Sequence, residues 1–304
     1  MTDSPLSWID GKLIPEHLAH ATPFDQGLHY GLGVFEGIRA YATPTGCTVF
    51  RLDAHLDRMA RGAEQLGMRL DIAALAEGVE ALCRANSLGD AYIRPIAWLG
   101  DGQGLSLDVR NLHTRMAIRT LPLASHLSKA ARARGLWLQT SPWCRNRAES
   151  IPPLKLTGGY VNAVLAKRHA MLHGFDGALF LRDEAVVEAS AENLGFVKDG
   201  AITLISHPDA LPGITRQTLA TLTAAITRPA TLTELRDADE VFVCGTSAEV
   251  QPVTRIDNQR WDIGPVTRSL QSTYAEVVRG KAPHGSAWNH PVHHRQARAD
   301  AKVA

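Results

Sequence analysis

Residues 151–160 read Ile-Pro-Pro-Leu-Lys-Leu-Thr-Gly-Gly-Tyr and place Lys155 between apolar neighbours, with a pair of glycines just beyond it. An amine attacks a carbonyl group only in its deprotonated form, and apolar surroundings make the charged form of a lysine costly. The stretch therefore predicts that Lys155 binds an aldehyde cofactor. A solvated surface lysine is the commoner explanation of any single lysine, so the prediction depends on three segments that follow.

The first of these segments, residues 186–194, reads Val-Val-Glu-Ala-Ser-Ala-Glu-Asn-Leu. Glu188 follows a β-branched pair and precedes small residues, so its carboxylate can lie beside a bound ring. There it would keep the nitrogen of a pyridine ring protonated, which makes the ring an electron sink. A hairpin glutamate that faces water is the alternative.

The second segment, residues 211–216, reads Leu-Pro-Gly-Ile-Thr-Arg. The Pro-Gly pair ends a loop, and the spacing after it predicts a helix over 214–226. Free amides at the start of that helix, with the Thr215 hydroxyl, would form a phosphate site, although an ordinary capped helix has the same pattern. The third segment predicts a buried strand over 240–244 that ends in Gly-Thr-Ser, where glycine lets backbone amides approach an anion.

The order of these segments resembles that in the branched-chain amino acid aminotransferases, which belong to fold-type IV, or class IV, of the pyridoxal phosphate enzymes. Residues 29–39, 51–58 and 91–95 are similar to further motifs of that family. The resemblance runs from about Trp8 to about Arg279. It implies an α+β fold with the two-domain architecture typical of D-amino acid aminotransferase and its relatives, and pyridoxal 5′-phosphate as the cofactor.

The resemblance also implies a role for each matching residue. Lys155 would form the Schiff base and move the proton at the substrate's Cα. The residues that would bind the cofactor are Arg58, Tyr160, Glu188, Leu211, Gly213, Ile214, Thr215 and Thr246. The residues that would form the substrate site are Tyr30, Phe35, Gly37, Tyr92, Arg94, Gly245, Thr246 and Ser247. Arg94 would meet the distal carboxylate of glutamate, because a guanidinium contacts a carboxylate through two hydrogen bonds. No metal site is expected.

Two departures from the family pattern bear on the substrate. The family has an aromatic pair after a proline between the domains, whereas this chain has Leu123 and His126. Gly195 stands where the family reads Asn-Leu-Phe, and we expect it to loosen its strand and to remove an aromatic wall. Both changes put a strict preference for branched-chain substrates in doubt and leave the cofactor chemistry intact.

The pattern of helices and strands predicts two domains. Residues 1–120 would form a smaller N-terminal domain, 121–134 a connector and 135–281 a larger cofactor-binding domain. Helices are expected over 54–66 and 72–85, and strands over 91–99 and 201–205. The polar, aperiodic tail 282–304 is expected to be disordered, so its histidines are not taken as a metal site.

Composition limits the class of protein. A chain of 304 residues with a net charge of +1 carries no basic stripe of the kind that binds nucleic acid. No apolar stretch is long enough to span a membrane, and the first residues lack the pattern of a signal peptide. Four widely spaced cysteines without metal-binding spacing indicate reduced thiols, so we expect a cytoplasmic protein.

The expected activity is transamination between an L-amino acid, leucine, isoleucine or valine, and 2-oxoglutarate. The two substrates would react in turn, with ping-pong kinetics, in a homodimer or larger assembly of the kind that the family forms. The alternatives are a transaminase of the same fold for D-amino acids, amines or a specialised precursor, an aminodeoxychorismate lyase, and a binding protein that has lost the chemistry. The presence of Lys155, Glu188, Tyr160 and Arg58 argues against the last.

Overall fold

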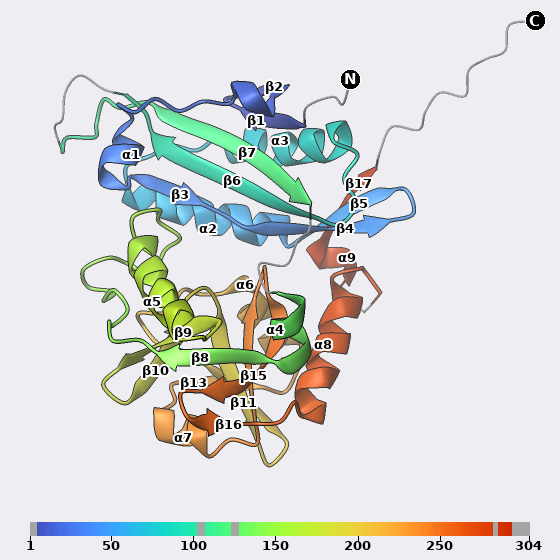
Figure 1. Ribbon diagram of the computed structural model, residues 1–304. Helices are drawn as coiled ribbons and strands as arrows, with labels where there is room; N and C mark the ends of the chain where they lie inside the picture. Colours follow the sequence, from blue (N-terminus) through green and yellow to red (C-terminus); the bar gives the residue numbers. More distant parts are fainter. Residues whose placement is uncertain (1–4, 102–106, 123–127, 282–284, 294–304) are drawn as a thin grey trace, which may run out of the picture.

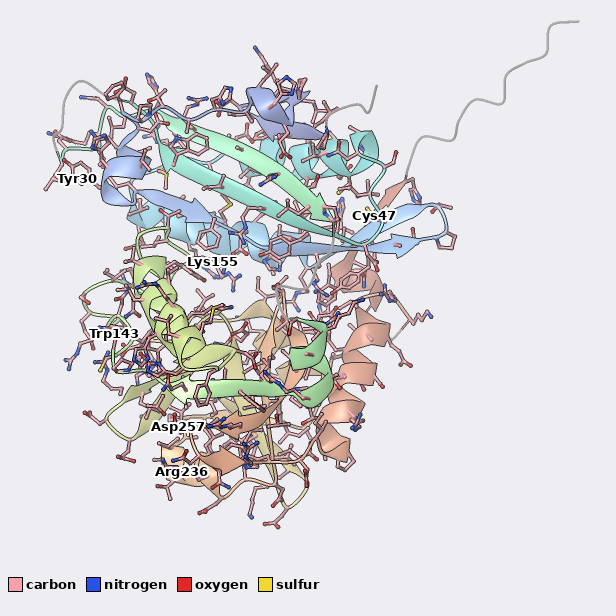
Figure 2. The ribbon with its side chains drawn as sticks, in the orientation of Figure 1. Tyr30, Cys47, Trp143, Lys155, Arg236 and Asp257 are labelled. Carbon is pink, nitrogen blue, oxygen red and sulfur yellow. The ribbon has the colours of Figure 1, made fainter. Side chains whose placement is uncertain are left out.

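Two β-sheets lie on either side of the segment that carries Lys155 (Figure 1) (Figure 2). The computed structural model describes residues 5–101, 107–122, 128–281 and 285–293. Antiparallel pairs predominate in both sheets, and helices are interspersed along the chain rather than alternating regularly with parallel strands. This arrangement confirms the predicted α+β class.

The first sheet has eight strands within the described residues. In order across the sheet they are β17 (Asn289–His293), β5 (Gly46–Phe50), β4 (Ile38–Thr43), β6 (Ala91–Leu99), β7 (Thr114–Pro122), β1 (Leu6–Ile9) and β2 (Lys12–Pro15), while β3 (Gly33–Phe35) pairs with β6. Every second residue of β6 is buried, as expected where one face of a sheet meets the core. Helices α2 (Leu52–Gln65) and α3 (Ile72–Ala85) supply the rest of that core.

The second sheet has nine strands in the described part of the chain. Their order is β10 (Ala185–Ala189), β9 (Gly177–Arg182), β8 (Leu136–Thr140), β15 (Glu249–Ile256), β14 (Glu240–Gly245), β11 (Asn193–Lys198), β12 (Ala201–Ile205) and β13 (Ile226–Arg228), with β16 (Gln259–Arg260) beside β15. Alternate residues of β14 enter different clusters: Val241 and Val243 lie in one, Phe242 and Cys244 in the other. The sheet is therefore covered on both faces.

The remaining helices connect the strands, and some of them cover the second sheet. They are the 3-10 helix η1 (Glu16–Leu18) and the α-helices α1 (Gln26–Tyr30), α4 (Lys129–Arg134), α5 (Tyr160–Leu172), α6 (Ile214–Leu222), α7 (Leu232–Arg236), α8 (Pro265–Val277) and α9 (Gly285–Trp288). Helix α5 packs beside β9, and α6 and α8 pack on the face that carries Phe242. None of the helices in the described ranges is long and apolar enough to cross a membrane.

Three of the predicted elements have the expected bounds, whereas helix α2 begins two residues before the predicted 54–66 and one other helix is shorter than predicted. Helix α3, strand β6 and strand β12 have the predicted bounds, 72–85, 91–99 and 201–205. The helix predicted over 214–226 ends at Leu222 instead. The backbone of Ile226–Arg228 pairs with β12 in parallel as β13, so these residues take part in a sheet rather than in a helix.

The tail is the clearest correction to the predicted organisation. Disorder was expected over 282–304, but Asn289–His293 form β17 and pair with β5 at the edge of the first sheet. The Trp288 ring packs edge-on against Phe50 and lies 4.8 Å from the Arg51 guanidinium. Residues 289–293 thus return to the N-terminal sheet. The division at 121–134, where α4 occupies part of the connector, stays a prediction.

Candidate active site

The lysine segment is attached to the first sheet by backbone contacts. Leu156 forms an isolated β-bridge with Val34, and the Phe35 N–H donates to the Lys155 carbonyl oxygen at 3.1 Å. The segment therefore pairs with β3 through a short bridge before the chain turns into α5. These contacts fix the backbone of Lys155 at the junction of the two sheets, where its side chain is labelled in Figure 2.

The amine of Lys155 faces a phenol. Its Nζ donates to the Tyr160 hydroxyl at 2.7 Å and lies 4.8 Å from the centre of the Phe35 ring. Tyr160 is the first residue of α5, so the turn through the glycine pair brings the two groups together. The structure therefore places side by side the two residues predicted to contact the reacting end of the cofactor.

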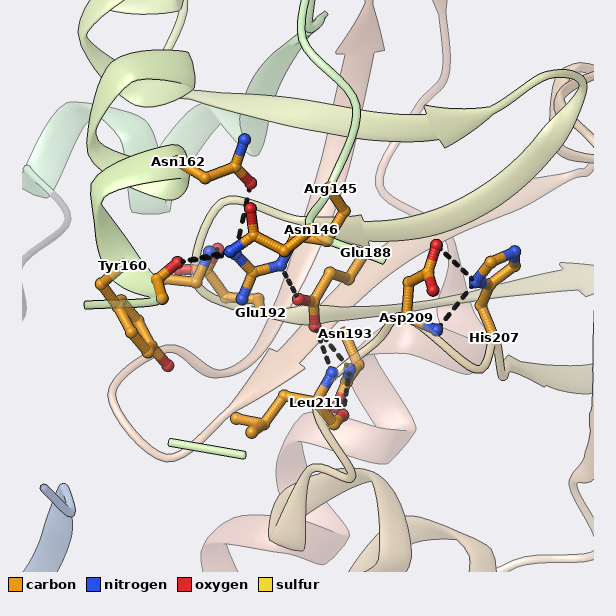
Figure 3. A network of polar contacts seen from close by, with 12 residues as sticks. Arg145, Asn146, Tyr160, Asn162, Glu188, Glu192, Asn193, His207, Asp209 and Leu211 are labelled. Atoms are coloured by element: carbon orange, nitrogen blue, oxygen red, sulfur yellow. Dashed lines mark hydrogen bonds and ion pairs between the residues drawn. The ribbon is translucent and has the colours of Figure 1, made fainter. Parts of the chain in front are cut away.

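The Glu188 carboxylate is buried and held from three sides (Figure 3). Arg145 Nε donates to Oε1 at 2.7 Å, and the other oxygen accepts from the Leu211 N–H at 3.0 Å and from Asn193 Nδ2 at 3.3 Å. A register shift between Val186 and Glu188 marks a β-bulge, a feature that re-aims a side chain. Burial raises the pKa of Glu188, while Arg145 and the Leu211 N–H oppose that rise.

Arg145 is a site residue that sequence reasoning missed. It lies in the irregular stretch 141–150, where no periodicity or spacing distinguishes it from Arg147 two residues later. Besides its ion pair with Glu188, it donates through Nη1 to the Gly159 carbonyl oxygen at 3.2 Å, beside the turn into α5. One guanidinium thus joins the predicted ring-binding carboxylate to the start of the helix that carries Tyr160.

The groups where α6 begins can bind an anion. Gly213 precedes the helix, and the first backbone amides of any helix lack a partner within it. Arg58 reaches this point from α2, because its Nη1 donates to the Pro212 carbonyl oxygen at 3.1 Å. A Cβ atom at Gly213 would lie 1.9 Å from Asn193 Oδ1, so only glycine fits there. Amides, helix dipole and guanidinium together favour a phosphate group.

The same cavity also carries the residues predicted to bind substrate. A Cβ at Gly37 would lie 1.8 Å from the Tyr92 hydroxyl, so this glycine makes room for the tyrosine. Arg94 donates through Nη2 to the same hydroxyl at 3.0 Å, and its guanidinium lies over the Phe35 ring at 4.8 Å. The Arg94 Nε is buried and has no hydrogen-bond partner among the described residues. Such an atom is costly to leave unpaired, which favours an anionic ligand here.

These groups line one cavity of about 640 Å³. The predicted site residues that line it are Phe35, Gly37, Arg58, Tyr92, Arg94, Lys155, Tyr160, Glu188, Leu211, Gly213, Ile214, Thr215, Gly245, Thr246 and Ser247. The lining residues that the sequence did not single out are Leu121, Pro122, Arg145, Ser190, Ala191, Glu192, Asn193 and Cys244. Most of these additional residues lie close in sequence to predicted ones. The exceptions are Arg145 and the two residues at the end of β7, Leu121 and Pro122.

Tyr30 is the exception among the predicted residues. It ends α1, is 42% exposed, and is not part of the cavity lining (Figure 2). Tyr30 thus lies outside the cavity that a single chain forms, and its predicted place in the substrate site stays a prediction. The glycine Gly31 that follows has φ of 67° and turns the chain away from α1 into β3.

The structure also bears on the departures from the family pattern. β11 pairs with strands on both sides, so Gly195 does not loosen it. A Cβ there would lie 2.3 Å from the Phe242 ring, which fills the space above the glycine, and Gly195 is not part of the cavity lining. Its expected effect on the substrate pocket is therefore wrong. Leu123 and His126 lie outside the described residues.

The donor set fits pyridoxal phosphate. An amine, a phenol and a buried carboxylate surround the space between the two sheets, and a helix start with an arginine supplies an anion site on the same cavity. A cavity of about 640 Å³ is of the size that holds a cofactor together with a small substrate.

Comparison with known proteins decides the family. The family model described as "Amino-transferase class IV" matches residues 33–256. The chain belongs to this family. Its relatives include the branched-chain-amino-acid aminotransferase of Pseudomonas aeruginosa, which is 36% identical over 92% of this chain and 95% of that protein. This extent of similarity places the chain in the branched-chain aminotransferase family within class IV.

Solved structures agree with the fold. The branched-chain aminotransferase of Thermoproteus uzoniensis, determined with norvaline, has a TM-score of 0.90 and 35% identity, and the match covers 95% of this chain and all of that one. The enzyme of Thermobaculum terrenum in its pyridoxal phosphate form has a TM-score of 0.87 and 30% identity, with 96% and 99% covered. The predicted fold type and cofactor, pyridoxal 5′-phosphate, are confirmed for this class IV aminotransferase.

The Arg145–Glu188 pair predicts a pH effect. In Arg145→Gln the guanidinium no longer counteracts the effect of burial, so the pKa of Glu188 rises further. The carboxylate is ionised only above its pKa, so in the variant it becomes protonated at a higher pH than in the wild type. We expect the acid limb of the kcat/KM profile to move to higher pH, with activity at pH 7 reduced about tenfold or more. Arg147→Gln, which alters an exposed neighbour, is the control. An unmoved acid limb in Arg145→Gln would contradict this role.

Proposed function

We propose that this enzyme transfers the amino group of L-leucine, L-isoleucine or L-valine to 2-oxoglutarate. The observation that carries the proposal is the Lys155 amine, 2.7 Å from the Tyr160 hydroxyl, in a cavity that also holds Glu188 and the start of α6. Its relatives named as branched-chain aminotransferases support the donor class.

The residues have separate tasks in this reaction. When bound, pyridoxal phosphate supplies an electron sink for negative charge that develops at the substrate's Cα. Lys155 takes the Cα proton of the amino donor and, in the second half of the cycle, gives a proton to the Cα derived from the oxo acid, because its Nζ is the amine in the cavity and is oriented by Tyr160. Glu188 holds the proton on the ring nitrogen and is itself oriented by Arg145. Arg58 and the first amides of α6 bind the phosphate and anchor the cofactor.

Arg94 explains how one site accepts two different substrates in turn. A branched aliphatic side chain packs against Phe35 and the apolar parts of Tyr92, whereas the distal carboxylate of glutamate or 2-oxoglutarate pairs with Arg94. The buried Arg94 Nε without a partner supports this second task. Because both substrates use the same cavity, the first product leaves before the second substrate binds, which gives ping-pong kinetics.

Replacement of Arg94 separates the two kinds of substrate. Arg94→Ala is expected to lower kcat/KM for glutamate and 2-oxoglutarate by about 10-fold to 100-fold, because a charge-assisted contact is lost, and to change leucine by much less. Arg119→Ala is a matched control, because Arg119 is the cross-strand partner of Arg94 on β7 but pairs with Glu16 in solvent. Equal losses for glutamate and leucine would show that Arg94 does not bind the distal carboxylate.

Replacement of Lys155 tests the chemistry itself. Lys155→Ala removes the amine that binds the cofactor covalently and moves the Cα proton, so turnover should fall below detection and the visible absorbance of the lysine-bound cofactor should vanish. Lys198→Ala, at an exposed position, serves as the control. Continued turnover by Lys155→Ala would rule out the proposed role.

The surface of α5 supports assembly into a homodimer. The helix turns its alanines, Ala163, Ala166 and Ala170, inward, while Val161 and Val164 are 62% and 63% exposed. A helix that is apolar on its outer side as well is typical of one that a partner covers. The end of α1 adjoins this surface, because the Gly158 N–H donates to the Gly31 carbonyl oxygen at 3.1 Å, and it adds Leu28, which is 70% exposed.

Sedimentation velocity tests the assembly. The wild-type enzyme should sediment as a dimer or a larger species, and Val164→Glu should shift it toward the monomer, because a buried unpaired charge opposes association. Ile226→Glu places the same charge at an equally exposed apolar residue of β13, away from α1 and α5, and should leave the assembly unchanged. A monomeric wild type, or equal effects of the two variants, would refute the proposed interface.

A further inference from the structure

Glu36 is a buried carboxylate that the proposed chemistry does not use. It lies between β3 and β4 in the first sheet, is fully buried, and is not part of the cavity lining. Its two oxygens accept from the Arg58 guanidinium in a bidentate arrangement, Nε to Oε1 at 2.7 Å and Nη2 to Oε2 at 2.9 Å. A buried carboxylate without hydrogen-bond partners destabilises the fold, so Glu36 requires both of its contacts with Arg58. Those two contacts fix the position of the guanidinium.

His55 completes the arrangement. It precedes Arg58 by three residues on α2, and its Nδ1 lies 2.7 Å from Glu36 Oε2. Arg58 and His55 hold the pKa of Glu36 well below its usual range despite burial, whereas burial lowers the pKa of His55. The carboxylate is therefore ionised and the imidazole neutral at pH 7. Glu36, Arg58 and His55 together carry almost no net charge.

The geometry of Arg58 leaves one side of its guanidinium for the cavity. Nε and Nη2 bind Glu36, while Nη1 donates to the Pro212 carbonyl oxygen, two residues before the first residue of α6. The Arg58 side chain thus reaches from α2 to the start of α6 and lines the cavity there. Since the group is almost neutral overall, its contribution to phosphate binding comes from the direction of the guanidinium N–H groups rather than from net charge.

We propose that Glu36 is a positioning residue for the cofactor's phosphate: it fixes the Arg58 guanidinium at the start of α6 without touching the cofactor. The inference rests on the proposed roles of Arg58 and α6. Without the carboxylate, the guanidinium keeps only the contact of Nη1 with the Pro212 carbonyl oxygen to orient it, and the phosphate loses a directed contact. Glu36 also accepts from the Gly37 N–H at 3.1 Å, next to the substrate residues, so a purely structural effect of its replacement must be separated from the phosphate effect.

The ratio of two dissociation constants makes that separation. Apo-protein is titrated with pyridoxal phosphate and with pyridoxal, which lacks the phosphate, and binding is followed by absorbance. In Glu36→Gln the preference for the phosphorylated form should fall by about 10-fold to 100-fold, because a charge-assisted contact is lost. General damage to the fold would weaken both ligands alike and would leave the ratio unchanged.

Glu240 offers a matched control in the other sheet. It is also buried, and its carboxylate accepts from the Val266 and Thr267 N–H groups at the start of α8, outside the cavity lining. Glu240→Gln should keep the wild-type ratio. Glu36→Asp, whose shorter side chain draws the carboxylate away from Arg58, should lower the ratio as well and serves if Glu36→Gln fails to fold.

The outcomes distinguish this inference from the proposed function. A wild-type ratio in both Glu36→Gln and Glu36→Asp would overturn the role of Glu36 while leaving the anion site intact. A wild-type protein that does not prefer the phosphorylated ligand would instead refute the anion site at α6, and the inference with it.

Discussion

The free-energy cost of burying charged side chains constrains how the residues between the two sheets are arranged. Among the acidic residues at or near the space between the sheets, Glu36, Glu188 and Glu249 are each paired with an arginine: Glu36 with Arg58, Glu188 with Arg145, and Glu249 with Arg39. An unpaired charge in such surroundings would destabilise the fold, so the pairs constrain how the elements pack. The same pairs orient the groups that face the cavity. Stability and activity therefore depend on one set of contacts.

Two of these carboxylates show how surroundings divide the tasks. Arg58 and His55 keep Glu36 ionised, with a pKa well below its usual range, and it serves as a fixed anchor. Burial outweighs the influence of Arg145 on Glu188, so its pKa is raised, and its position on the cavity suits it to share a proton with a ring nitrogen. Carboxylates of one chemical type thus act differently because desolvation and neighbouring charges differ.

Local sequence pointed to part of the site because those residues lie in short segments with their own turn chemistry, whereas Arg58, Tyr92 and Arg94 were predicted from the family resemblance. Lys155, Glu188 and the start of α6 each follow such a pattern, and the structure brings them to one cavity. Arg145 could not be predicted, because its contact with Glu188 joins an irregular stretch to a β-bulge. Strand β17 was missed because an edge strand depends on its distant partner β5 rather than on its own polar sequence. Tyr30 shares a motif with Phe35 but lies on the outer surface, since Gly31 redirects the chain.

The most direct test of the proposed activity is a half-reaction measurement on the purified enzyme with bound pyridoxal phosphate. Its visible absorbance is followed after separate additions of L-leucine, L-isoleucine, L-valine, L-glutamate, their D-enantiomers and simple amines. Our account predicts that the four L-amino acids convert the cofactor and that the D-enantiomers and amines do not. A response confined to D-amino acids, amines or another donor would keep the fold and the cofactor but contradict the proposed substrates.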